Sequence, residues 1–137
     1  MYLGVDWGTK KIGLAVGSKI PYELATLNND GKIFDRILKL CQEENIEKIV
    51  IGMPMFESGD ENENAGSINE FGKKLKDLTK KPIYFEPENL TTQTALQLLK
   101  EEGATPDEIE QKVDQLAARL ILEQYIDNQG EVSEESL

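Results

Sequence analysis

The spacing of apolar residues changes along the chain and divides it into a strand-rich beginning and a helix-rich remainder. Three short apolar runs, separated by tight turns, favour strands at residues 2–7, 12–16 and 22–27. Because the connections between these runs are so short, the strands are expected to pair as an antiparallel meander. Further on, apolar residues recur at intervals of three and four from residue 33 to residue 41, which is typical of a helix that packs on one side.

Helices and strands alternate through the rest of the chain. Two apolar strands, 48–52 and 82–86, lie on either side of a helix at 68–78. Two more helices follow, one over residues 91–99 and a last one that begins at Thr105-Pro106. The order βββαβαβαα predicts an α/β fold with a mixed five-stranded sheet and helices on both faces. This is the ribonuclease H-like arrangement. The same order also builds half of an actin-like ATPase, so the order alone does not choose between them.

The length of 137 residues corresponds to one domain. We expect this domain to cover residues 1–127 and residues 128–137 to form an acidic, flexible tail. No signal peptide or membrane-length apolar run is visible. The chain has one cysteine, Cys41, and no histidine, which excludes an internal disulfide and a Cys/His zinc site. These features favour a cytoplasmic protein with no membrane partner.

The net charge of −11 is unevenly distributed. Acids and bases balance over residues 1–50, so the whole excess of acids lies beyond residue 50. Such acidity argues against broad, nonspecific binding of nucleic acid through a basic surface. It does not exclude an enzyme that acts on nucleic acid, because clustered carboxylates can hold metal ions that neutralise phosphate locally.

Asp6 stands near the end of the first predicted strand and opens a D-x-G-T turn with Gly8 and Thr9. Gly8 permits close approach of the backbone to a ligand, and Lys10 and Lys11 add positive charge. Such a turn suits phosphate or a metal-bound phosphate. The alternative is that Asp6 only forms the turn.

Two further acids could join Asp6. Glu88 follows the strand at 82–86, although a surface carboxylate near a helix N-terminus is the simpler interpretation. Asp114 borders the apolar stripe of the last helix, where it could also be solvated. The small residues Ala117 and Ala118 would let this helix approach the sheet closely and bring Asp114 towards Asp6. Three converging carboxylates could hold Mg²⁺ or Mn²⁺ and support hydrolysis of a phosphodiester.

Four motifs in the chain resemble the YqgF family, whose members are described as pre-16S rRNA nucleases and as Holliday junction resolvases. Residues 3–16 (LGVDWGTKKIGLAV) are similar to the opening of the family, and residues 51–55 (IGMPM) to its V-G-L-P-L segment. Residues 88–92 (ENLTT) resemble its D-E-R-L-T-T segment, and residues 112–118 (KVDQLAA) its final D-x-x-A-A helix. The motifs follow the family order and span nearly the whole chain.

The resemblance implies a ribonuclease H-like fold, a divalent metal ion and hydrolysis of phosphodiester bonds. It makes Asp6, Glu88 and Asp114 the catalytic and metal-binding acids. The residues expected to contact substrate lie in the same motifs and are Gly8, Thr9, Lys10, Lys11, Thr91, Thr92 and Lys112. Pro87 and Asn89 replace the usual Asp and Arg, which removes a planar phosphate clamp.

These features favour a nuclease that matures the 5′ end of the small-subunit ribosomal RNA precursor, acting as a monomer or weak homodimer on ribosomal precursor particles. Structured RNA is the expected substrate ahead of branched DNA. One alternative is a resolvase of four-way DNA junctions, which would need a symmetric dimer. A nucleotide-binding module would lack its second half in a chain this short. A noncatalytic binding protein of the same fold is the remaining alternative.

Overall fold

The computed structural model describes residues 1–54, 63–88 and 91–132. These residues form the predicted elements in the predicted order. The elements are β1 (Tyr2–Trp7), β2 (Lys11–Gly17), β3 (Tyr22–Asn28), α1 (Ile33–Glu43), β4 (Lys48–Pro54), α2 (Ala65–Thr79), β5 (Ile83–Glu88), α3 (Thr91–Glu101) and α4 (Pro106–Val132). Most of the segment between β4 and α2 lies outside the described residues.

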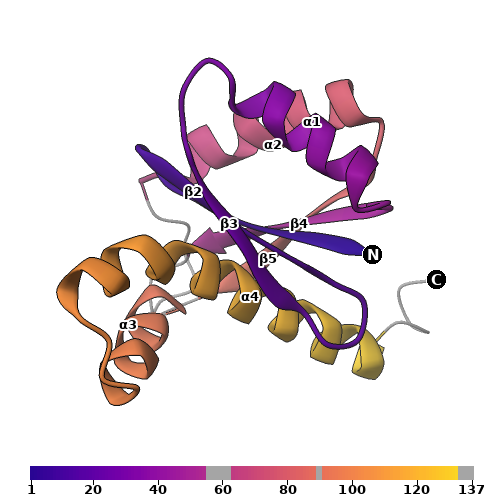
Figure 1. The fold of residues 1–137 in the computed structure, drawn as a ribbon. Helices are drawn as coiled ribbons and strands as arrows, with labels where there is room; N and C mark the ends of the chain where they lie inside the picture. The colour runs from indigo at the N-terminus through magenta and orange to yellow at the C-terminus, as the bar shows by residue number, and fades with distance from the viewer. Residues whose placement is uncertain (55–62, 89–90, 133–137) are drawn as a thin grey trace.

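The five strands form one mixed sheet in the order β3-β2-β1-β4-β5. β1, β2 and β3 are antiparallel, as the short connections predicted, and β1, β4 and β5 are parallel. Helices α1 and α2 cover one face, and α3 and α4 lie on the other (Figure 1). The predicted α/β fold with helices on both faces is therefore confirmed.

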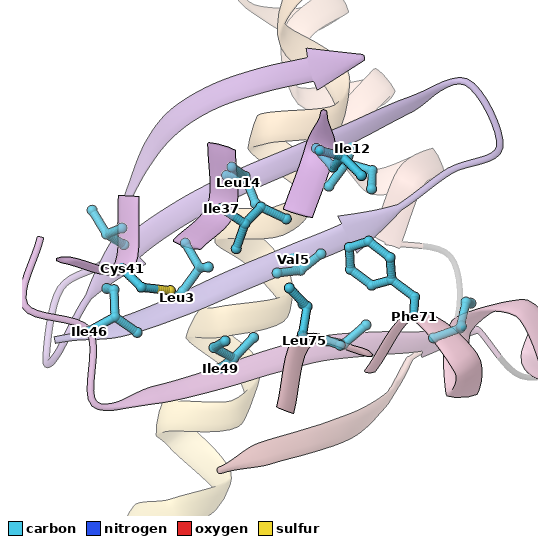
Figure 2. Close-up of a cluster of buried hydrophobic side chains, with 14 of the residues drawn as sticks. Leu3, Val5, Ile12, Leu14, Ile37, Cys41, Ile46, Ile49, Phe71 and Leu75 are labelled. Atoms are coloured by element: carbon cyan, nitrogen blue, oxygen red, sulfur yellow. The ribbon is translucent and has the colours of Figure 1, made fainter. Parts of the chain in front are cut away.

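The main hydrophobic core fills the space between the sheet and the pair α1 and α2 (Figure 2). Alternate residues of β1, Leu3 and Val5, point into it and are fully buried. They meet Ile37 of α1 and Leu75 of α2, which come from the apolar stripes of those helices. Burial of each such side chain contributes about 1.5–3 kcal/mol to stability.

On the opposite face, α4 packs with its backbone almost directly against β1 and β2. A Cβ atom added to Gly13 would clash with the carbonyl oxygen of Asp114, and one added to Gly4 would lie 2.8 Å from that of Ala118. Ala118 is fully buried at this contact, whereas Ala117 is buried in the cluster that α4 forms with α3. The close approach predicted from these two alanines is therefore present, and two glycines on the strands are equally necessary for it.

Helix α4 begins where the sequence predicts. The hydroxyl of Thr105 accepts a hydrogen bond from the Glu108 N–H (3.2 Å), and the Glu108 carboxylate accepts one from the Thr105 N–H (2.9 Å). This reciprocal capping box satisfies two N–H groups at the start of the helix. Its end differs from the prediction, because the helix continues to Val132 and so includes part of the expected tail. Residues 133–137 lie outside the described residues.

Near its C-terminal end, α4 is held to the sheet by aromatic contacts around one lysine. The Lys48 Nζ lies 5.0, 4.8 and 5.5 Å from the ring centroids of Tyr2, Tyr84 and Tyr125. It also donates a hydrogen bond to the Tyr125 hydroxyl (3.1 Å). Cation–π contacts of this kind link α4 to β1, β4 and β5 at once.

The close contact at Gly13 makes a prediction about stability. Gly13→Ala should lower the free energy of unfolding by about 2–3 kcal/mol, because the added methyl group must displace the backbone of α4. The measurement is urea unfolding followed by circular dichroism. Gly66→Ala is the matched control, since nothing lies within 4 Å of its added Cβ. Equal stability of the two variants would contradict the close contact.

Candidate active site

Asp6 lies at the end of β1 on the face of the sheet that α4 covers. Side chains alternate along a strand, so Asp6 shares its face with Gly4, which contacts α4 directly. In the antiparallel ladder Asp6 is paired with Gly13 of β2. Gly13 has no side chain, so it leaves the surface next to Asp6 open to α4.

Asp114 reaches the same place from α4. Its backbone carbonyl is the group that packs against Gly13, the direct partner of Asp6. Asp6 and Asp114 therefore flank a single glycine, although they lie at opposite ends of the sequence. The structure thus places the backbones of these two predicted acids next to the same glycine.

The Asp114 carboxyl group is half-buried, and its surroundings change its acidity. Burial raises the pKa of Asp114 above its ordinary value of 3.8, and the positive charge of Lys11 partly opposes this shift. A half-buried carboxyl group with a raised pKa beside a lysine is typical of a functional site.

Glu88 is the last residue of β5, where it pairs with Pro54 of β4. The parallel strands β1, β4 and β5 have their carboxyl ends at the same edge of the sheet, so the backbones of Asp6 and Glu88 lie at that edge on either side of β4. Ligands in open α/β sheets bind outside this edge. The Glu88 side chain lies outside the described residues.

The donor chemistry of the site fits a hard divalent cation. Asp6 and Asp114 would supply carboxylate oxygens, which Mg²⁺ and Mn²⁺ prefer as ligands. Among the residues that the structure describes, no three acidic, cysteine or histidine side chains lie close enough together to hold a metal ion. A complete site would therefore need a further ligand, and Glu88 is the predicted one.

The turn between β1 and β2 is built as the D-x-G-T motif predicts. A Cβ on Gly8 would lie 2.6 Å from the Lys11 carbonyl oxygen, so this tight turn requires glycine. Asn29 braces the turn, because its side-chain amide donates to the Gly8 carbonyl (2.8 Å) and its backbone N–H to that of Lys10 (2.8 Å). The sequence analysis did not identify Asn29, and only its Asn-Asp-Gly turn signal marked that region.

The other predicted substrate contacts differ in exposure. Thr9, Lys10, Thr92 and Lys112 are exposed, whereas Thr91 is buried at the start of α3. Lys11 is half-buried at the start of β2, and its Nζ lies 3.9 Å from a carboxylate oxygen of the exposed Glu110.

A buried carboxylate near the end of β5 was not predicted from the sequence. Glu86 is only 7% exposed, and it accepts hydrogen bonds from Gln124 (2.6 Å) and Asn128 (2.8 Å) of α4. The same Gln124 amide also donates to the carbonyl of Pro87 (2.7 Å). This network holds the strand end that leads to Glu88 against α4. The only signal in the sequence was the spacing of Gln124 and Asn128, one helical turn apart.

Proteins of known fold resemble the whole chain. RuvC of Thermus thermophilus, solved in complex with a Holliday junction substrate, superposes with a TM-score of 0.56 at 16% identity, covering 93% of this chain and 94% of RuvC. The Holliday junction resolvase of Fowlpox virus superposes with a TM-score of 0.52 at 15% identity, covering 93% and 98%. At these identities the likeness concerns the fold, and it confirms the predicted ribonuclease H-like arrangement.

Relatives are found at higher identity by sequence. A protein of Streptococcus thermophilus named "Putative pre-16S rRNA nuclease" is 30% identical over 133 residues, which cover 91% of this chain and 96% of the relative. A protein of the same name from Lactococcus lactis is 33% identical over 132 residues, covering 91% and 92%. Residues 1–128 match the family model described as RuvX, Holliday junction resolvase. The chain therefore belongs to the RuvX family, which is the YqgF family that its motifs resemble.

Proposed function

We propose that this protein is a metal-dependent nuclease that hydrolyses phosphodiester bonds in structured nucleic acid, with maturation of the 5′ end of the 16S rRNA precursor as its reaction. The observation that carries the proposal is the placement of Asp6 and Asp114 on either side of Gly13. The name shared by the two relatives supports the choice of RNA.

In this proposal Asp6, Glu88 and Asp114 hold the metal ion and are the catalytic acids. The chemistry that Mg²⁺ or Mn²⁺ supplies when bound is polarisation of the phosphate and activation of water. Lys11 lies close enough to Asp114 to act on its charge, so it is well placed to attract a substrate phosphate to the same position. Histidine is absent from the chain, so a carboxylate is the candidate base among its own residues.

The turn and the helices around the site provide the groups that we propose contact the substrate. Gly8, Thr9 and Lys10 form the exposed turn beside Asp6, and Lys112 is exposed on α4 shortly before Asp114. We propose that these groups bind the phosphate backbone. Thr92 would assist from α3, whereas the buried position of Thr91 favours a packing role.

Resolution of four-way DNA junctions is the second candidate, favoured by the description of the family model. Paired cuts in a junction require a symmetric dimer. The RNA reaction needs only a monomer or weak homodimer, with ribosomal precursor particles in the cytoplasm as the place of action. No helix among the described residues is both long and apolar enough to cross a bilayer.

Loss of one proposed metal ligand tests the function. Asp6→Asn should lower metal-dependent cleavage by about 100-fold or more, because stabilisation of the transition state by a bound metal is worth several kcal/mol. The measurement uses labelled 16S precursor RNA and a four-way DNA junction in parallel, each with Mg²⁺, Mn²⁺ or chelator.

Asp35→Asn is the matched control, since Asp35 is exposed on α1, across the sheet from the site. It should cleave like the wild type. Cleavage of RNA alone would support the proposed reaction, and cleavage of the junction alone would favour the second candidate. Undiminished cleavage by folded Asp6→Asn would refute the assigned site.

The raised pKa of Asp114 predicts a dependence of stability on pH. The folded protein holds this proton more tightly than the unfolded chain, so the Asp114 contribution to stability is lost as pH rises through the folded pKa. In chelator, Asp114→Asn should therefore be more stable than the wild type at pH 7. This advantage should shrink as pH falls towards 4.

Thermal unfolding at a series of pH values measures the effect. Asp127→Asn serves as the control, because Asp127 is exposed on the same helix and its change should alter stability by no more than about 0.5 kcal/mol. An Asp114→Asn variant that is less stable than the wild type at pH 7 would contradict the burial of a charged carboxylate.

A further inference from the structure

A second charged feature lies away from the site, at the C-terminal half of α2. Residues 73–81 contain five lysines and one acid, in a chain whose net charge is −11. The concentration of positive charge in one short segment of such an acidic protein creates a local field of opposite sign. We therefore asked where these lysines point and what they contact.

Three of the lysines form a stripe on the exposed side of α2. The buried residues Phe71, Gly72 and Leu75 define the side of the helix that faces the sheet. At 100° per residue, Lys73, Lys76 and Lys80 fall on the solvent side within about 60° of one another. Lys74 lies apart from them, because its Nζ packs over the ring of Phe34 at 5.7 Å.

The lysine stripe runs beside an exposed aromatic ring of the edge strand. A Cβ on Gly72 would lie 2.7 Å from the Phe85 Cζ, so β5 and α2 meet at this pair. Phe85 remains 38% exposed. Where α2 ends, Lys76 and Lys80 line a shallow depression of about 490 Å³ together with Asp77, Lys81 and Pro82, so three lysines stand against one acid there. We call Lys73, Lys76, Lys80 and Phe85 the lysine surface.

The lysines of this surface have no partners of opposite charge. Within the described part of the chain, Lys73, Lys76 and Lys80 form no ion pair, although the protein carries a large excess of carboxylates. Lys80 also ends the helix in the left-handed conformation (φ 60°), which glycine adopts at lower cost. Neither the charges nor the choice of Lys80 is explained by folding.

Unpaired lysines beside an exposed aromatic ring form the combination that binds single-stranded nucleic acid. The ammonium groups neutralise phosphates, and the flat ring stacks on a base whatever its sequence. An acidic protein partner would have to place an apolar side chain over the ring among its carboxylates, whereas a polynucleotide presents phosphates and flat bases side by side along one strand. The chemistry therefore favours a polynucleotide.

We propose that the lysine surface binds a single-stranded segment of the RNA substrate outside the cleavage site. The inference rests on the proposed function for the identity of the nucleic acid. Phe85 lies three residues before Glu88 on β5 and Lys80 eight residues before it, so the surface begins about 10 Å from the candidate active site and extends away from it. The surface thus anchors RNA next to the site, in addition to the contacts proposed for the turn between β1 and β2.

Binding of a labelled single-stranded RNA measures the role of the surface directly. The assay uses chelator and Asp6→Asn protein, so that no cleavage occurs. Lys73→Gln/Lys76→Gln/Lys80→Gln should weaken binding about tenfold near 0.1 M salt. The slope of log K against log salt should fall by about 2, since each lost phosphate contact on a single strand contributes about 0.7.

A matched triple variant controls for net charge. Lys19→Gln/Lys32→Gln/Lys100→Gln removes the same charge from exposed lysines elsewhere, and it should change the affinity less than twofold. Phe85→Leu should weaken binding about fivefold without changing the salt slope, because stacking is lost and phosphate contacts remain.

Lys80→Gly separates binding from folding. Glycine suits the left-handed position, so this variant should melt at a higher temperature than the parent while binding RNA less tightly. Unchanged RNA affinity of the folded Lys80→Gly variant would contradict the role of Lys80 in binding.

These experiments distinguish failure of the lysine-surface inference from failure of the proposed function. Equal RNA affinity of the two triple variants would overturn the inference, whether or not the wild type cleaves, and an acidic protein would then be the partner to seek. A selective loss of affinity in the first triple variant supports the inference, even if the wild type cleaves no RNA. In that case only the proposed reaction would fail.

Discussion

The contact between the backbone of α4 and strands β1 and β2 is the constraint on which the rest of the structure depends. Gly4 and Gly13 on the strands and Ala118 on the helix leave no room for a layer of side chains between them. The position of α4 is consequently fixed by atoms that cannot change rotamer. Asp114 lies one turn before Ala118, so its place beside Asp6 follows from the same contact.

Burial of Asp114 in this arrangement lowers the stability of the fold, and packing elsewhere in the molecule offsets the loss. Close packing removes water from Asp114, which raises its pKa and disfavours its charged form. The hydrophobic core holds α1 and α2 on the other face of the sheet. The tyrosines around Lys48 hold α4 against the sheet. These stabilising contacts keep the Asp114 carboxyl group in a position where its charged form is unfavourable.

The sequence was most informative where local chemistry determines structure. Apolar spacing predicted the strands, the helices and their order, and Ala117-Ala118 indicated the close packing of α4. It could not reveal the buried Glu86, because a glutamate on a strand normally faces solvent and its partners are supplied by a distant helix. The extension of α4 to Val132 was missed for a related reason. The acidic composition there suggested a tail, whereas Asn128 is held by a tertiary contact with Glu86.

Because the site depends on α4, the site can form only after α4 has been synthesised. Asp6 and its hairpin are synthesised early, and the meander of β1 to β3 can pair through local contacts alone. The face that carries Asp6 remains uncovered until α4 has been made, because the backbone against which Gly13 packs is still missing. An incomplete nascent chain therefore has the hairpin but no pair of acids. Whatever chemistry the site performs is withheld until α4 has been synthesised and packed.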